Sequence, residues 1–217
     1  MNDFKHYVFT RFNLLDDFDG LKTVYNNPDI PDPEAWMEHR MELFENLCLP
    51  SLKAQTCQNF TWLLSFAKET PQKYIRKCEE YDRVQVIYDY PRTWVRKNFT
   101  EGWLITSRID NDDYYEPTFI EQIQNQPNIY PPEIVDIDYR QLNIATGRFY
   151  TSCRATPNSP FLSLWEYIEP GQEAKTCYYC SHTNMPNHFR ARKIPEPLAT
   201  MVIHDRNVIN KIVGDEI

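Results

Sequence analysis

The sequence predicts an α/β fold with a mixed, mostly parallel central sheet flanked by helices, and a smaller mixed β region in the second half. In the first half, short apolar segments rich in β-branched residues alternate with segments of helical periodicity, the order typical of parallel βαβ units. Beyond Pro132, short β-rich segments follow one another between turn residues. We therefore expect one domain over residues 1–217, with halves of about 1–115 and 116–217.

The first half contains the strands and helices that are easiest to predict. Apolar runs predict strands over residues 7–10, 61–66, 83–88 and 103–106. Helical spacing predicts helices over residues 34–55, 71–81 and 117–126, and a helix or turn over residues 93–99. Pro50 is expected to divide the first helix into two pieces, and Thr70 to cap the second.

The remaining segments have weaker patterns. Residues 14–33 are rich in Asp, Asn and Pro and are expected to form a long loop. In the second half we expect short strands and hairpins over residues 134–139, 142–145 and 149–154, a loop over 156–160, a short helix over 161–167, and a strand at residues 201–203. No internal repeat or low-complexity tract is evident.

Composition restricts the class of protein. The net charge of −8 disfavours nucleic acid as the main partner, because phosphate backbones require a basic surface, although a divalent cation can neutralise a bound nucleotide locally. The six cysteines are scattered, so we expect reduced thiols and a cytoplasmic protein. The N-terminal segment lacks a signal-peptide apolar region, and no stretch has the length and hydropathy of a transmembrane segment.

The segment most suggestive of function is the acidic cluster Asp110, Asp112 and Asp113, interrupted only by Asn111. It directly follows the apolar run at residues 103–106, so a buried strand would carry these carboxylates to the carboxyl edge of the sheet, where open α/β folds bind ligands. Crowded carboxylates repel one another unless a cation lies among them, and Mg²⁺ and Mn²⁺ prefer oxygen ligands. The alternative is a solvated turn that caps the helix starting near Pro117.

Five segments, in order, resemble the nucleotide-sugar glycosyltransferases of GT-A fold, and within them the rhamnosyltransferase family. They are TRFN at 10–13, the helix from residue 36 that runs into the strand ending at 66, TSRIDNDD at 106–113, SPFLSL at 159–164 and VIHDRNVIN at 202–210. The sequence departs from the family pattern at residues 65–71, where many relatives have an aspartate-rich turn, and at Asp205, where a small residue is expected.

The resemblance implies that the first half binds a nucleotide-diphosphate sugar of UDP, TDP or GDP type, and that the second half faces a glycan acceptor. Asp110 and Asp112 would hold Mn²⁺ or Mg²⁺ and the donor ribose, and His204 would complete the metal shell. Asp113 would touch the donor sugar, which is L-rhamnose or another hexose. The expected nucleotide-binding residues are Thr10, Arg11, Arg96, Lys97, Arg108 and Asp110.

An enzyme that inverts the sugar configuration needs a base to take the acceptor proton, and Glu166 is the candidate. A retaining enzyme needs none, and the sequence leaves both possibilities open. Because 217 residues is short for a complete glycosyltransferase, the chain could also be one domain of a longer polypeptide.

Three other functions compete with this one. The first is a zinc-binding module, for which the possible ligands are Cys177, Cys180, His182 and His188. The second is a sugar-nucleotide pyrophosphorylase, although the five glycines form no phosphate-binding loop. The third is a catalytically silent nucleotide-sugar-binding domain, which the intact acidic cluster disfavours.

Overall fold

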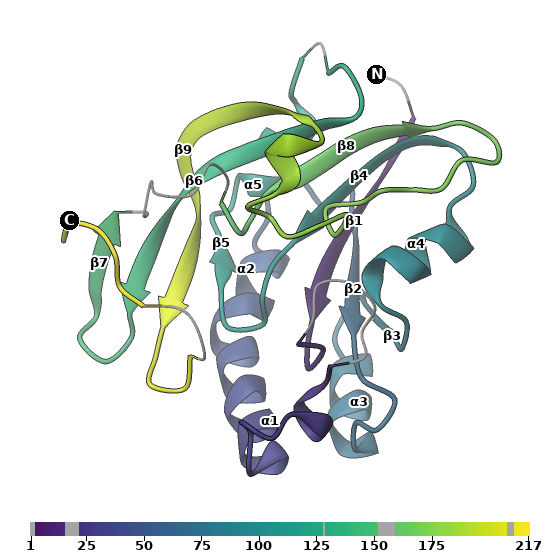
Figure 1. The fold of residues 1–217 in the computed structure, drawn as a ribbon. Coiled ribbons are helices and arrows are strands. Elements are labelled where there is room, and N and C mark those ends of the chain that lie inside the picture. The colour runs from purple at the N-terminus through teal and green to yellow at the C-terminus, as the bar shows by residue number, and fades with distance from the viewer. Residues whose placement is uncertain (1–2, 16–21, 128, 152–158, 208–210) are drawn as a thin grey trace.

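The computed structural model describes residues 3–15, 22–127, 129–151, 159–207 and 211–217. Within them, nine strands form one curved sheet in the order β3-β2-β1-β4-β8-β6-β9-β5, with β7 paired to β6 (Figure 1). This architecture confirms the predicted fold class.

The parallel half of the sheet consists of the four strands expected in the first half of the chain. They are β1 (Phe4–Arg11), β2 (Thr61–Ser65), β3 (Val84–Ile87) and β4 (Gly102–Arg108). Strand β1 pairs in parallel with β2 on one side and with β4 on the other. The strand order 3-2-1-4 reverses direction between β1 and β4, and such a switch point leaves a crevice at the carboxyl ends of the two strands.

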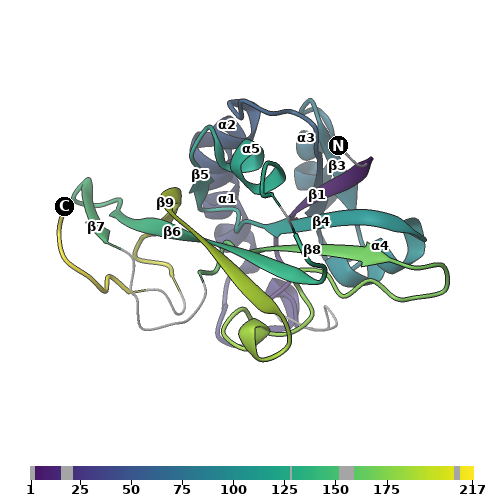
Figure 2. The same ribbon diagram turned by 90° about the horizontal axis from the view of Figure 1, so that it is seen from above.

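Helices cover both faces of this half (Figure 2). One face is packed by α1 (Pro33–Leu43), α2 (Leu49–Lys53), α3 (Gln72–Glu79) and α5 (Phe119–Gln124), whose apolar residues form a buried core with β1 and β2. The other face is covered by α4 (Pro91–Asn98) and by the segment of residues 174–189, which form a second core. The segment predicted as helix or turn over residues 93–99 therefore lies mostly in helix α4.

Two details of the predicted helices were wrong. Pro50 does not divide the helix, because a π-helical turn, Phe44–Cys48, joins α1 to α2, and the Leu49 N–H donates to the Phe44 carbonyl. Proline has no backbone N–H to donate, and the π-helical turn lets the helix continue past Pro50 without that hydrogen bond. Thr70 does not cap α3, because its hydroxyl instead donates to the Ala67 carbonyl at 2.6 Å.

The other half of the sheet is mixed and contains β5 (Tyr114–Tyr115), β6 (Glu133–Asn143), β7 (Arg148–Thr151), β8 (Ser163–Ile168) and β9 (Arg190–Ile203). Strand β6 pairs in parallel with β9, whereas β4–β8, β6–β8, β6–β7 and β5–β9 are antiparallel pairs. The two short strands predicted over 134–145 are one long strand, β6, and the strand predicted at 201–203 is the end of the much longer β9. Residues 152–158, which include parts of the expected strand 149–154 and loop 156–160, lie outside the described residues.

The helix predicted over residues 161–167 was wrong, because this segment forms β8 between β4 and β6. Five of the six residues of β8 are buried, so the apolar run has no alternation and does not distinguish a strand from a helix. Among the described residues, no helix combines the length and hydropathy needed to cross a membrane. The five cysteines in the described segments are free thiols.

Candidate active site

The acidic cluster lies in a turn directly after β4, at the carboxyl edge of the sheet. Asn111 fixes the turn against the end of β1, because its Nδ2 donates to the Phe12 carbonyl at 2.8 Å. Asp113 fixes it against β9, because its Oδ1 accepts the Val202 N–H at 2.8 Å. Asn111, Asp112 and Asp113 are all buried, so the alternative of a solvated turn was wrong. Nor does the cluster cap α5, whose N-cap residue is Thr118.

The two buried carboxyl groups have opposite electrostatic surroundings. Burial raises the pKa of Asp113 well above its usual value, and the negative charges of Asp112 and Asp110 raise it further. Burial would also raise the pKa of Asp112, but the Arg40 charge and the His204 hydrogen bond outweigh it and hold that pKa below its usual value. The turn therefore concentrates negative charge, and Arg40 forms an ion pair with one of its carboxylates, Asp112.

Helix α1 contributes residues that sequence reasoning did not assign to the site. Arg40 forms an ion pair with Asp112, and its Nη1 donates to Asn111 Oδ1 at 3.1 Å. The Arg40 guanidinium also lies 4.9 Å from the centre of the Trp36 ring. Trp36 and Arg40 are four residues apart and so share one face of α1, which faces the acidic turn.

The segment after β9 brings His204 to the same turn. His204 Nε2 lies 3.0 Å from Asp112 Oδ2, and Asn207 Nδ2 donates to the same oxygen at 3.4 Å. The ring stacks edge-on against His39 of α1, with 5.0 Å between ring centres. Burial lowers the pKa of His39, as do the neighbouring His204, Arg206 and Arg40. The structure thus brings together Asp112 and His204, two of the three predicted metal ligands.

Asp110, the third predicted ligand, lies in the same cavity as Asp112. This cavity has a volume of about 190 Å³ and is lined by Arg11, Phe12, Leu14, Leu15, Trp36, Arg40, Asp110, Asn111, Asp112 and Asn207. A second cavity of about 310 Å³ adjoins it at Leu14 and extends along the carboxyl ends of β2 and β3, past Glu69 and Tyr88. Together they form a polar groove along the carboxyl edge.

Two arginines flank the acidic turn on the opposite face of the sheet from α1. Arg11 ends β1 and Arg108 ends β4, and their guanidinium carbons lie 5.3 and 5.0 Å from the centre of the Tyr178 ring. Tyr178 is fully buried, so this aromatic ring holds both cations near the switch point. Both arginines were predicted from the sequence as nucleotide-binding residues.

Three other predicted nucleotide-binding residues, Thr10, Arg96 and Lys97, have protein partners of their own. Thr10 is fully buried on β1, and its hydroxyl accepts the Trp62 indole N–H at 3.0 Å in the core. Arg96 pairs with Glu173 at 2.7 Å. Lys97 pairs at 2.7 Å with Asp89, which lines the 310 Å³ cavity.

Glu166, the predicted catalytic base, is buried in β8 and pairs with Leu104 of β4. Leu104 lies three residues before Ser107, which forms the last β4–β8 pair near the carboxyl end of β4. The two carboxylate oxygens of Glu166 accept the N–H groups of Lys175 and Thr176, both at 2.9 Å. Burial raises its pKa despite these bonds. These contacts fix the start of the segment that leads to Tyr178, and Glu166 is not among the residues that line the two cavities of the groove.

The alternative zinc site has no geometric support. Cys177 is fully buried, and its N–H donates to Thr106 Oγ1 at 2.8 Å. His188 packs instead against the Tyr179 ring, at 5.2 Å between ring centres. Of the described residues, the three whose ligand atoms come within 4.8 Å of one another are His39, His204 and Asp205, and none belongs to the predicted zinc set.

Solved structures share this fold. S. aureus TarS 1-349 in complex with UDP-GlcNAc matches 94% of the chain at 11% identity, with a TM-score of 0.53, and the complex with UDP matches 92% at 9% identity, with a TM-score of 0.50. The chain spans 59% and 60% of those two structures, and 36% of a longer TarS structure. No curated protein matches the sequence.

A family model matches nearly the whole sequence. The match extends over residues 10–216, and the family is described as "Putative rhamnosyl transferase". This range includes the acidic turn, both arginines beside Tyr178 and the segment after β9. It confirms the resemblance found in the sequence: the chain belongs to the rhamnosyl transferase family.

Proposed function

We propose that the protein is a metal-dependent glycosyltransferase that moves a sugar, L-rhamnose or another hexose, from a nucleotide-diphosphate donor to a glycan hydroxyl. The observation that carries this proposal is the placement of Asp110 and Asp112, with Arg11 and Arg108 nearby, at the switch point between β1 and β4. Opposite charges gathered at this point suit a diphosphate held through a cation. The family match supports the reaction class.

The residues of the turn fit a hard divalent cation. Asp110 and Asp112 both line the 190 Å³ cavity, and burial, followed by the negative charges of Asp112 and Asp110, raises the pKa of the adjacent Asp113. Carboxylate oxygens are the ligands that Mg²⁺ and Mn²⁺ prefer. In this proposal Asp110 and Asp112 hold the cation, which stabilises charge on the departing diphosphate. His204, the third predicted ligand, lies with its Nε2 3.0 Å from Asp112 Oδ2, so in this proposal it orients that carboxylate through a hydrogen bond.

In this proposal the donor lies along the carboxyl edge of the sheet and extends through both cavities. The base would lie in the 310 Å³ cavity, where Tyr88 is 43% exposed and offers an aromatic face for stacking. The diphosphate would lie at Leu14 and the acidic turn, within reach of Arg11. The sugar would then lie close to Asp113. The TarS structures bind UDP and UDP-GlcNAc, which makes UDP the first nucleotide to test.

The proposal leaves Glu166 out of the reaction. Its carboxylate is occupied by two backbone donors, and an acceptor hydroxyl in the groove would not reach it. Asp113 stays a candidate, because it lies in the acidic turn next to Asp112, close to where the donor sugar would lie.

The test is a thermal-shift panel with UDP, TDP, GDP and CDP, each with and without Mn²⁺. We expect one nucleotide to raise the melting temperature only when Mn²⁺ is present, and Asp112→Asn to weaken that nucleotide at least about 100-fold, since one charged ligand is lost. Glu121→Gln is the matched control, because Glu121 lines a cavity at the opposite end of β1. The proposal fails if no nucleotide gives a shift, or if the two variants bind it equally.

A further inference from the structure

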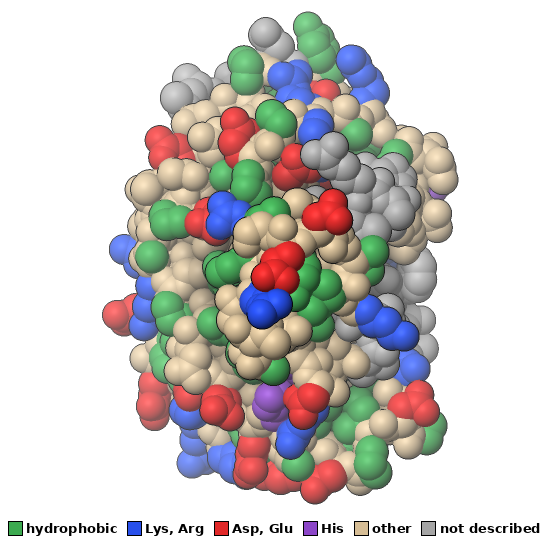
Figure 3. Space-filling view, turned by 90° about the vertical axis from the view of Figure 1, so that its left-hand side faces the viewer, with side chains coloured by type: hydrophobic (Ala, Val, Ile, Leu, Met, Phe, Trp, Pro, Cys, Tyr) green, Lys and Arg blue, Asp and Glu red, His purple; other side chains and the backbone are tan. Residues whose placement is uncertain are grey.

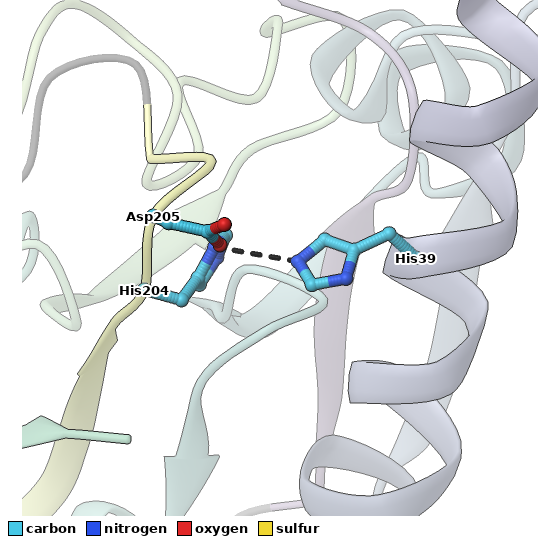
Figure 4. Close-up of side chains that lie close together, drawn as sticks. All are labelled: His39, His204 and Asp205. Carbon is cyan, nitrogen blue, oxygen red and sulfur yellow. Dashed lines mark hydrogen bonds between the residues drawn. The ribbon is translucent and has the colours of Figure 1, made fainter. Parts of the chain in front are cut away.

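Three potential metal ligands meet beside the acidic turn. His39 lies on α1, and His204 and Asp205 lie just beyond β9. The His39 Nε2 and His204 Nδ1 atoms are 3.4 Å apart, and the ligand atoms of all three residues lie within 4.8 Å of one another. Figure 4 shows the two rings and the Asp205 side chain pointing toward one another across the gap between α1 and the end of β9.

The hydrogen bonds of His204 indicate which of its nitrogens is available. The Arg206 N–H donates to His204 Nδ1 at 3.2 Å, so Nδ1 carries the lone pair and the ring proton is assigned to Nε2. Nε2 can then donate to Asp112 Oδ2, 3.0 Å away. Asn207 Nδ2 lies 3.2 Å from Nε2 and 3.4 Å from the same Asp112 oxygen, and its amide donates to the carboxylate. A carboxylate that holds one nitrogen in this way orients the other nitrogen toward a metal.

We propose that His39 Nε2, His204 Nδ1 and Asp205 form a site for an imidazole-preferring transition-metal cation of the Zn²⁺ class. Two nitrogens at the usual Zn–N distance of about 2.0–2.1 Å on a tetrahedral ion are separated by about 3.4 Å, which matches the distance between the two histidines. Two imidazoles and one carboxylate with an open fourth position are a common zinc ligand set. The bound ion replaces the Arg206 N–H as the partner of Nδ1.

The nearby positive charges already have partners. Arg40 is paired with Asp112, and Arg206 Nη1 donates to the Ala35 carbonyl at 3.2 Å. The site is also open to solvent, since Asp205 is exposed and His39 is half-buried. Figure 3 shows that acidic and basic side chains gather together in the lower part of one face of the molecule.

This site differs in chemistry from the proposed Mn²⁺ or Mg²⁺ centre. That centre uses the oxygens of Asp110 and Asp112, whereas this one uses two nitrogens and one oxygen and contacts Asp112 only through His204. The ion would join α1 to the segment after β9, which are separated by 165 residues in sequence. Zinc is therefore expected to stabilise the fold by mass action, with or without a nucleotide.

The test is a zinc titration of the whole chain, stripped of metal with a chelator and followed by competition with a chromophoric zinc chelator. We expect one equivalent of Zn²⁺, an affinity at least tenfold weaker in His39→Gln, and an unchanged affinity in His188→Gln, the matched control. Asp205→Asn, an exposed change that cannot disturb the core, should also weaken zinc at least about threefold.

Equal zinc affinity in wild type, His39→Gln and Asp205→Asn would overturn the site, as would a loss in His188→Gln. The readout is independent of the proposed transfer reaction, because zinc binding is measured without nucleotide. Asp110→Asn separates the two centres: it should remove Mn²⁺-dependent nucleotide binding and leave zinc affinity within twofold of wild type. If it instead reduced zinc affinity tenfold, the two centres would be one and this proposal would be wrong.

Discussion

The two ends of the parallel strands differ in a way that cavity size does not reveal. The amino ends of β1 and β2 border a cavity of about 1040 Å³, whereas the cavities at the carboxyl ends have volumes of about 190 and 310 Å³. At the larger cavity, His6 is satisfied by neutral partners, Ser107 Oγ at 2.8 Å and Gln124 Nε2 at 3.0 Å. At the 190 Å³ cavity, Asp110 and the buried Asp112 lie beside Arg11 and Arg40.

This contrast indicates that concentrated charge identifies the candidate active site better than volume does. Burial lowers the pKa of His6 to about 3, so this ring is uncharged at neutral pH and needs no charged ligand to balance it. The carboxyl end has neighbouring acidic groups that repel one another, and a bound cation would relieve that repulsion. Stability and nucleotide binding should therefore depend differently on the charges at the two ends of the strands and on pH.

The largest effect on stability is expected from Arg40→Met, made at the carboxyl end without metal. The change leaves the buried Asp112 carboxylate without its ion-pair partner, which should lower the free energy of unfolding by about 3 kcal/mol. The measurement is urea denaturation with and without Mn²⁺. If the cation binds at Asp112, Mn²⁺ should restore part of the loss.

Arg96→Met is the control for this variant, since its partner Glu173 is 70% exposed and the pair is worth less than about 1 kcal/mol. Equal losses in the two variants would mean that Arg40 is an ordinary surface charge.

At the amino end we expect a pH effect of about 2 kcal/mol from His6 alone. Its folded pKa of about 3 lies below the ordinary 6.5, so the unfolded chain binds the proton more readily. The stability is therefore complete above pH 6.5 and declines as the pH falls toward 3, by about 2 kcal/mol between pH 7 and pH 5. Urea denaturation at the two pH values should show a smaller difference in His6→Gln. An unchanged difference would show that His6 is not a buried neutral group.

Sequence reasoning predicted the parallel half of the fold well because its signals are local. Strands β1 to β4 are short apolar runs between helical segments, and each was located within a few residues. It failed at β8, where burial on both faces removes the alternation that distinguishes a strand. It also missed most of β9, whose first half is rich in charged residues and proline and is specified by pairing with the distant β6.

For the site, sequence reasoning located the groups that follow strands and missed those that come from a helix. The acidic turn was predictable because it follows the buried strand β4. His39 and Arg40 were not, because helical periodicity identifies the apolar stripe of α1 and carries no information about its polar face. Their signal was the spacing of Trp36 and Arg40, an aromatic residue and a cation four residues apart on one helix face. The partner across the gap, Asp112, depends on tertiary packing.

A smaller difference is expected when one cation is removed from each end. Arg11→Ala should weaken UDP binding with Mn²⁺ about tenfold, because Arg11 lines the 190 Å³ cavity and could contact the diphosphate. Lys5→Ala, which removes a cation that lines the 1040 Å³ cavity, should change the affinity by less than about twofold. Isothermal titration with UDP gives both values. A tenfold loss of UDP affinity in Lys5→Ala would mean that the nucleotide binds at the amino ends of the strands.

The smallest effect, and the one of opposite sign, is expected from Asp113→Asn. The folded pKa of Asp113 lies well above its ordinary value of about 4, so the charged form costs stability at neutral pH. The asparagine Oδ1 can keep the bond from the Val202 N–H without the charge. We expect a gain of about 1 kcal/mol in the free energy of unfolding at pH 7.5, which disappears below pH 4, where the unfolded chain also holds the proton.

Asp82→Asn, an exposed change, should alter stability by less than about 0.5 kcal/mol. A loss of stability in Asp113→Asn at pH 7.5 would mean that the turn already compensates its charge, and the need for a cation at the carboxyl end would lose its main electrostatic argument.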